Sequence, residues 1–272
     1  MSGEPCRSRR SPDAALHRST HRSERACYPY CPVRVAVLSD IHSNGPALEA
    51  VLAALPEVDA IWQLGDVVGY GPHPVGVIER LSSKGAGGVR GNHDAAALGE
   101  IDTEWFNGDA RTAVEWSGTQ LTAPARKWLT ALPTTRREGH FTLAHASPRD
   151  PVWEYVYSPS IAAAVFGAFD TTHCLVGHTH VPLVFREGRD AIEMLDPRIG
   201  EVVRLDERRT ILNPGSVGQP RDGDPRASAM VLDTEALTAT WLRIPYPVEE
   251  TQAAMREAGL PARLVERLSY GL

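Results

Sequence analysis

A chain of 272 residues, with 42% hydrophobic and 23% charged residues, is suited to one sizeable globular domain, and its composition excludes a disordered protein. The formal net charge of -6 offers no general attraction for nucleic acid or for an anionic membrane surface. The apolar runs are strand-sized and shorter than the roughly 18 residues of a membrane span. The composition therefore predicts a soluble protein without a membrane partner.

The first 32 residues differ in composition from the rest of the chain. They contain six arginines and three acidic residues, a net charge of +3, which leaves -9 for residues 33–272. With almost no branched aliphatic residues this segment cannot bury a core, so we expect a disordered basic leader over residues 1–32. It lacks the apolar centre of a secretory signal, and the cysteines do not indicate a disulfide framework, so the cytoplasm is the expected compartment.

From residue 33 onward the pattern alternates between strands and helices. Expected strands cover residues 33–38, 59–64, 88–90, 141–144, 174–176, 181–185, 210–212, 229–233 and 240–244. Expected helices cover residues 46–55, 74–81, 109–131 as two helices, and 248–268 with a break at 259–261. This order predicts one α/β domain over residues 33–272, with a mixed sheet or two packed sheets and helices outside.

Polar residues follow five of these strands at the point where the apolar run stops. The segments are Asp40-Ile41-His42, Gly65-Asp66, Gly91-Asn92-His93-Asp94, His145 and Gly177-His178-Thr179-His180. Taken singly, each is compatible with a turn, a helix cap or an inert surface pair. Five of them at strand ends, where ligands bind in open α/β sheets, instead favour one shared site.

These carboxylate, amide and imidazole groups form a ligand set for two divalent cations. Carboxylate with imidazole suits ions such as manganese, iron or zinc, whereas an all-oxygen set would suit magnesium or calcium. A dinuclear site needs one bridging carboxylate, and Asp66 is the candidate because it stands alone after Gly65 at a strand end.

The ordered motifs closely resemble those of the calcineurin-like metallophosphoesterase superfamily, in which D-x-H, G-D, G-N-H-D/E, H and G-H-x-H follow one another. The resemblance covers residues 33–245, and the run from Gly65 to Gly71 looks like the small bacterial and archaeal phosphodiesterase-like branch. It implies two packed mixed β-sheets flanked by helices, a four-layer α/β/β/α sandwich.

The resemblance also implies two divalent ions, manganese, iron, zinc or nickel, with manganese expected to support activity in vitro. One ion would be held by Asp40, His42, Asp66 and His180, and the other by Asp66, Asn92, His145 and His178. The implied reaction is hydrolysis of a phosphate ester, in which a metal-bridged hydroxide attacks phosphorus and His93 acts as general acid. Asp94 is expected to support the adjacent chain or cap a helix.

One departure from neighbouring branches bears on the substrate. Protein Ser/Thr phosphatases and symmetrical dinucleoside tetraphosphate hydrolases carry an arginine where this chain has Tyr70. Arg149 and Arg221 in later loops are candidate replacement phosphate contacts, although exposed arginines are often only solvated. Tyr70 itself contacts substrate or is structural. The aromatic run Trp153, Tyr155 and Tyr157 either walls a pocket or packs one.

The leading hypothesis is a dinuclear metal phosphoesterase that acts on a small phosphate ester, a phosphodiester in preference to a monoester. A protein phosphatase or dinucleoside polyphosphate hydrolase is the alternative within the superfamily. A non-catalytic scaffold on the same fold is the alternative of another class; it would predict loss of His93 or of several ligands, and all are present. The acidic body argues against a nuclease.

Overall fold

The structure is a computed structural model that describes residues 33–272, so the leader expected over residues 1–32 lies outside the described residues. Two six-stranded mixed sheets form the centre of the described chain. The first has the order β3-β2-β1-β11-β12-β9, made of β1 (Arg34–Leu38), β2 (Ala60–Gln63), β3 (Gly87–Gly88), β9 (Val202–Arg204), β11 (Ala227–Asp233) and β12 (Thr238–Ile244). The second has the order β4-β5-β6-β10-β7-β8, made of β4 (Thr135–Glu138), β5 (Phe141–Ala144), β6 (His173–Leu175), β7 (Pro182–Glu187), β8 (Ile192–Leu195) and β10 (Thr210–Pro214).

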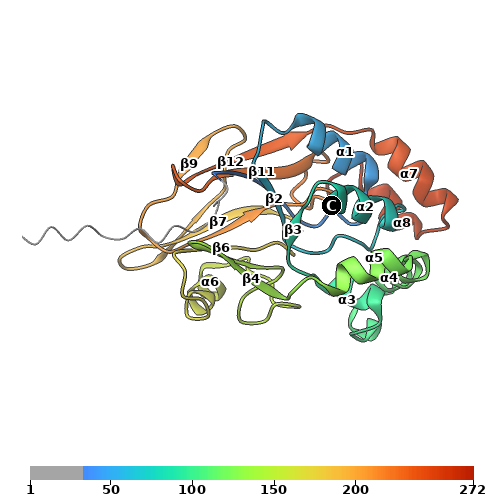
Figure 1. The fold of residues 1–272 in the computed structure, drawn as a ribbon, viewed down its shortest axis with the longest axis horizontal. Coiled ribbons are helices and arrows are strands. Elements are labelled where there is room, and N and C mark those ends of the chain that lie inside the picture. Colours follow the sequence, from blue (N-terminus) through green and yellow to red (C-terminus); the bar gives the residue numbers. More distant parts are fainter. Residues whose placement is uncertain (1–32) are drawn as a thin grey trace, which may run out of the picture. The chain divides into compact units, whose positions relative to one another are not determined.

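Helices cover the outer faces of both sheets (Figure 1), with α1 and α6 on opposite sides of the strands. On the first sheet the apolar layer includes residues of α1 (Gly45–Ala54), α2 (Pro74–Ser83), α3 (Asn92–Leu98), α4 (Gly108–Gln120), α5 (Ala123–Thr130), α7 (Val248–Glu257) and α8 (Ala262–Arg267). On the second sheet it includes residues of α6 (Pro159–Phe166). The predicted four-layer sandwich is confirmed.

The alternation of side chains along β1 shows how the layers are built. Val35 and Val37 enter the core between the sheets, while Ala36 and Leu38 face the helices. Successive residues of a strand point to opposite faces, so a strand buried on both sides needs an unbroken apolar run. That run is what predicted the strand from the sequence.

Parallel pairing brings the ends of the site-bearing strands together. β1 pairs in parallel with β2, and β2 with β3, while β6 pairs in parallel with β5 and with β10. The edges of the two sheets then meet through the loops, because the amide of His178 donates to the Asp40 carboxylate at 3.1 Å and Nδ1 of His145 donates to the carbonyl of Leu64 at 2.8 Å. The five polar segments therefore converge on one place.

Six elements were not expected from the sequence: β4, β8, β9, α3, α6 and the 3₁₀ helix Thr103–Trp105. β4, β8 and β9 lie at sheet edges with mostly exposed or half-buried residues, so they lack the apolar pattern of an inner strand. α3 begins inside the Asn92 motif, and α6 is preceded by Ser158, whose side chain accepts from the amide of Ile161 as an N-cap. The Ser158-Pro159 pair was a start signal for α6 in the sequence.

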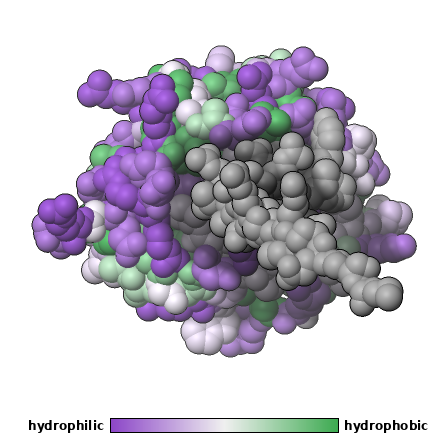
Figure 2. All heavy atoms as spheres, turned by 60° about the vertical axis from the view of Figure 1, so that its left-hand side comes forward, coloured by the Kyte–Doolittle hydropathy of each residue, from purple (hydrophilic) through white to green (hydrophobic). Residues whose placement is uncertain are grey.

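Outside the grey atoms, the face of the molecule in Figure 2 is mostly hydrophilic, with hydrophobic residues scattered over it. Within residues 33–272, no helix combines the length and the apolar character needed to cross a membrane.

Replacement of Trp241 by alanine is expected to destabilise the domain by about 3–5 kcal/mol. Its ring is fully buried in the core between the sheets, and its Nε1 donates to the carbonyl of Asn213 at 2.8 Å, so removal leaves a cavity and an unpaired carbonyl. Urea denaturation followed by circular dichroism measures the loss. Trp105→Ala is the matched control, because that side chain is 79% exposed and should change stability by less than about 0.5 kcal/mol.

Candidate metal centre

The seven predicted metal ligands lie together at the ends of the central strands. Asp40 and His42 follow β1, Asp66 follows β2, Asn92 opens α3 after β3, His145 follows β5, and His178 and His180 follow β6. All seven side chains are buried. Buried carboxylates and imidazoles at this density need a compensating charge or proton.

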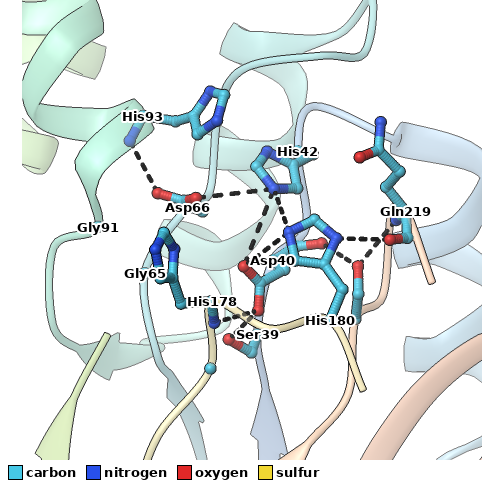
Figure 3. A network of polar contacts seen from close by, with 12 residues as sticks. Ser39, Asp40, His42, Gly65, Asp66, Gly91, His93, His178, His180 and Gln219 are labelled. Atoms are coloured by element: carbon cyan, nitrogen blue, oxygen red, sulfur yellow. Dashed lines mark hydrogen bonds and ion pairs between the residues drawn. The ribbon is translucent and has the colours of Figure 1, made fainter. Parts of the chain in front are cut away.

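The first group of donors consists of Asp40, His42, Asp66 and His180 (Figure 3). Asp40 Oδ1 lies 3.2 Å from Nε2 of His180, and this Nε2 lies 3.1 Å from Nε2 of His42. Oδ2 of Asp66 lies 3.7 Å from Nε2 of His42. Donors bound to one cation at about 2.0–2.2 Å are themselves roughly 3.0–3.6 Å apart, so these spacings fit a single ion.

The second group shares Asp66 with the first. Nε2 of His145 lies 3.3 Å from Oδ2 of Asp66, 3.1 Å from Oδ1 of Asn92 and 3.0 Å from Nδ1 of His178. The same oxygen, Oδ2 of Asp66, therefore faces both groups. This is the position that a bridging carboxylate must have between two ions.

Backbone carbonyls decide which imidazole nitrogens are free to bind metal. Nδ1 donates to Val68 at 3.1 Å in His42, to Gln219 at 2.5 Å in His180 and to Leu64 at 2.8 Å in His145. A carbonyl only accepts, so in each neutral ring the proton is on Nδ1 and Nε2 presents a lone pair. These lone pairs face one another and the carboxylates at about 3 Å, and Asp40 Oδ1 has no hydrogen-bond donor. Such an arrangement is repulsive without cations, and the donor set fits them.

The backbone at the site is held in an unusual conformation. Within residues 33–272, eight non-glycine residues have a positive φ, and seven of them are at the site: Asp40, His42, Ser43, Asp66, Tyr70, His178 and His180. Left-handed backbone costs an L-residue of order 1 kcal/mol or more and is concentrated at functional sites. The turns after the strands thus aim the ligands inward at the expense of local stability.

Two glycines of the motifs are required by close packing. A Cβ on Gly177 would collide with Oγ of Ser39 and lie 2.9 Å from Oδ2 of Asp40, and a Cβ on Gly91 would collide with the carboxylate of Asp66. Both glycines let one loop pass directly over a carboxylate of another. The glycines are therefore part of the ligand geometry.

Residues 33–237 match the calcineurin-like phosphoesterase superfamily domain. The chain belongs to the calcineurin-like phosphoesterase superfamily. It is a metal-dependent phosphoesterase, and its buried histidine and aspartate clusters are consistent with a dinuclear metal site.

The relatives of this superfamily member include bacterial and archaeal proteins, as the motifs implied. A metallophosphoesterase from Sphaerobacter thermophilus is 46% identical, with 89% of this chain and 100% of that chain covered and a TM-score of 0.82. An uncharacterised protein of Methanocaldococcus jannaschii is 33% identical over 244 residues, which cover 87% of this chain and 98% of the relative. A hypothetical protein from Pyrococcus horikoshii OT3, 20% identical with a TM-score of 0.69 over 88% of this chain and 99% of its own, shares the fold.

His93 lies beside the metalloenzyme's ligands without belonging to either group of four. Its ring packs edge-on against His42 and Phe106, each at 4.8 Å between centroids, and its Nδ1 is buried without a partner. Burial lowers the pKa of His93 to about 4, with Asp66 opposing the shift and Arg221 adding to it. His93 also lines the cavity next to the ligands.

Asp94 has the supporting role expected from the sequence. Its carboxylate accepts from the amides of Gly91 and Val68, each at 3.0 Å, and so connects the start of α3 to the loop after β2. Burial, with the nearby charge of Asp66, raises the pKa of Asp94 to about 7.

The cavity beside the ligands has a volume of about 100 Å³ and includes two of the three predicted substrate contacts. Arg221 lines it, with Nη2 donating to the hydroxyl of Tyr70 at 3.3 Å and to Oε1 of Gln219 at 2.9 Å. Arg149 is not among the lining residues, and its guanidinium pairs with Glu154. A guanidinium is thus present at this centre, supplied by Arg221 and resting on the Tyr70 that stands where related enzymes have arginine.

The sequence did not single out every residue that lines the cavity. Trp153 and Tyr155 of the aromatic run line it and Tyr157 does not, while Trp105, Phe106 and Asn107 are lining residues without a motif. In the sequence, the only indication of this part of the cavity was the pair of adjacent aromatic residues Trp105 and Phe106 before Asn107, the N-cap of α4.

Substitution of single ligands is expected to change the number of ions bound. Wild-type protein should bind about two Mn²⁺ per chain, Asn92→Ala about one, and Asp66→Asn almost none, because only Asp66 faces both groups. Metal analysis by mass spectrometry after desalting measures the content, with circular dichroism to confirm folding. Two tightly bound ions in Asn92→Ala would show that Asn92 is not a ligand.

Metal affinity is expected to rise with pH between about 7.5 and 9. In the metal-free protein burial alone would lower the pKa of His145, but the charges of Asp66 and Asp40, together with hydrogen bonds to Asp66 and to the Leu64 carbonyl, outweigh it and raise the pKa to about 9. Because a metal binds only the neutral ring, each pH unit should increase the apparent affinity up to about tenfold, levelling off above 9. Calorimetric Mn²⁺ titrations in two buffers of different ionisation enthalpy measure the proton released. His145→Asn should release none, and a flat pH profile in wild type would contradict ligation by His145.

Proposed function

We propose that this phosphoesterase hydrolyses phosphodiesters in preference to phosphomonoesters, with the phosphate held at the metal centre beneath Arg221. The proposal rests on the charge of the side chains that line the cavity. Arg221 is the single arginine or lysine among the described residues that line the cavity, while Asp66 is an anion in the same wall. A diester carries one negative charge and a monoester up to two. Beyond the two metal ions, which would contact either phosphate, the cavity offers only one cationic side chain, and this suits the diester better.

The ions implied by the donor set would neutralise the phosphoryl oxygens and activate the attacking water when bound. We propose manganese for this role, because a mixed set of imidazole, carboxylate and amide donors suits borderline divalent ions. For the compartment we propose the cytoplasm, on the ground that the cysteine pattern of the sequence does not indicate a disulfide framework.

In the proposed reaction Arg221 and Tyr70 orient the ester. The guanidinium makes no ion pair with a carboxylate of the described chain, its Nε is buried without a partner, and its plane lies over the Tyr70 ring at 5.6 Å. It therefore has donors to spare for a phosphoryl oxygen, the kind of charge-assisted contact that arginine makes well. Arg149 would have to leave Glu154 before it could contribute.

His93 is the proposed general acid. One of its ring nitrogens lies within 4.8 Å of donor atoms of His42 and Asp66, and its backbone amide donates to Oδ1 of Asp66 at 2.9 Å, which fixes its place. A bound phosphate adds negative charge next to the ring and so raises the pKa of His93 from its value in the free protein. The imidazolium can then protonate the departing oxygen.

Manganese-loaded protein is expected to hydrolyse bis-p-nitrophenyl phosphate with a higher kcat/KM than p-nitrophenyl phosphate. His93→Ala should lower kcat by about 10²–10⁴-fold if proton donation is rate-limiting. Initial rates by absorbance, on protein first stripped of metal, measure both. Faster turnover of the monoester would overturn the diester preference, and no turnover with manganese, iron, zinc or nickel despite tight binding would favour the scaffold alternative.

Two arginine variants separate the substrate contact from the surface ion pair in the same assay. Arg221→Gln should lower kcat/KM about 10–100-fold, the loss expected for a charge-assisted hydrogen bond. Arg149→Gln is the matched control and should change it less than about twofold, because Arg149 is occupied by Glu154. The reverse order of effects would assign the phosphate contact to Arg149.

A further inference from the structure

Besides Tyr70, four aromatic side chains line the catalytic cavity: Trp105, Phe106, Trp153 and Tyr155, here called the aromatic rim. They come from two segments, one before α4 and one after β5. Lone aromatic residues on a surface need no explanation, but four that converge on a catalytic cavity do.

The aromatic rim is continuous with the metal centre. Tyr155 stacks on the ligand His178 with 3.9 Å between ring centroids, and Phe106 contacts His93 at 4.8 Å. Trp153 packs edge-on against Phe106 at 5.3 Å. Any group attached to a phosphate at the metal centre therefore emerges between aromatic rings.

Trp105 is held out toward solvent by a fixed backbone. It ends the short 3₁₀ helix Thr103–Trp105, in which Asp102 caps the amide of Glu104 at 2.8 Å. The carbonyl of Thr103 accepts from Nε of Arg111 at 3.0 Å, and its hydroxyl donates to the carboxylate of Glu115 at 2.7 Å. The next residue, Phe106, is buried, whereas the Trp105 side chain is 79% exposed. The hydrogen bonds of the backbone thus hold the exposed indole in a defined position.

The lining of the cavity indicates what the aromatic rim would contact. The cavity is small, about 100 Å³, and its lining runs from Asp66, Asn92 and His178 to the exposed Trp105. An ester substituent on a phosphate at the metal centre can therefore extend over Trp105 and Tyr155. Asp102 and Glu104 directly precede Trp105 in the chain, and their charges disfavour a substituent that carries further phosphates.

We propose that the aromatic rim binds a planar, uncharged aromatic substituent of the phosphodiester, which stacks on the indole of Trp105. The inference rests on the proposed function, because the phosphate of the same ester must lie at the metal centre. Stacking of a ring on an aromatic side chain contributes about fivefold to more than a hundredfold in affinity. Trp105 is then a residue that determines specificity through binding, without a part in the chemical step.

Binding of two slowly hydrolysed diesters tests the proposal apart from turnover. Calorimetry with manganese-loaded protein compares diphenyl phosphate with dimethyl phosphate for wild type, Trp105→Ala, Trp105→Phe and Tyr157→Ala. Tyr157 is the matched control, because it is 60% exposed on the neighbouring loop and does not line the cavity. Wild type and Tyr157→Ala should prefer the diphenyl ester at least about tenfold, Trp105→Ala should lose most of that preference, and Trp105→Phe should keep much of it.

Equal binding of the two esters by wild type, or an unchanged preference in Trp105→Ala, would overturn the proposal. Turnover distinguishes this failure from failure of the proposed function. Wild-type hydrolysis of methyl p-nitrophenyl phosphate without any aryl preference in binding would retain the diesterase and reject the aromatic rim. The opposite result is a binding preference for diphenyl phosphate that depends on Trp105, in a protein that hydrolyses neither bis-p-nitrophenyl phosphate nor methyl p-nitrophenyl phosphate. This result would support the binding site at the aromatic rim and reject the proposed diesterase activity.

Discussion

The mutual repulsion of lone pairs at the ends of the two sheets is the constraint on which the site depends. Three imidazoles are fixed by carbonyl acceptors on Nδ1. The unprotonated nitrogens of His42 and His180 face each other, that of His145 faces His178, and the carboxylates of Asp40 and Asp66 lie about 3–4 Å from them. Such a cluster is stable only with positive charge inside it, from protons or from metal. The raised pKa of His145, about 9, is the response of the metal-free site, in which a proton takes the place of a cation.

The sandwich makes this concentration of donors possible. The inner strands are buried on both faces and hydrogen-bonded on both sides, so they hold their ends fixed while the turns beyond them adopt left-handed backbone. The apolar core between the sheets offsets the cost of those turns. Stability and reactivity are thus separated in space, with the core behind the strand ends and the strained ligand turns at them.

The surroundings of the ligands give this member of the superfamily its individual character. One guanidinium, that of Arg221, rests on Tyr70 where related enzymes place arginine in the earlier loop. The aromatic rim then continues outward from His178 and His93. A site with little positive charge from side chains and much aromatic surface would suit an ester of low charge with a flat substituent, which is the common basis of the proposed function and of the inference about Trp105.

The sequence by itself predicted the fold class and the grouping of the seven candidate donors, because each motif directly follows an apolar strand and strand ends in such sheets share one edge. It also placed Asp94 as a supporting residue. The sequence could not decide whether Arg149 or Arg221 is the phosphate contact. Arg149 is occupied by an ion pair with Glu154, and Arg221 is placed at the cavity beside Tyr70, which lies 151 residues away from it in the chain. Nor could it find the aromatic rim, because Trp105 sits in a short 3₁₀ helix without apolar periodicity. Only the tertiary structure brings that indole to the cavity, since its position depends on hydrogen bonds from α4 and on the packing of Phe106 beside it.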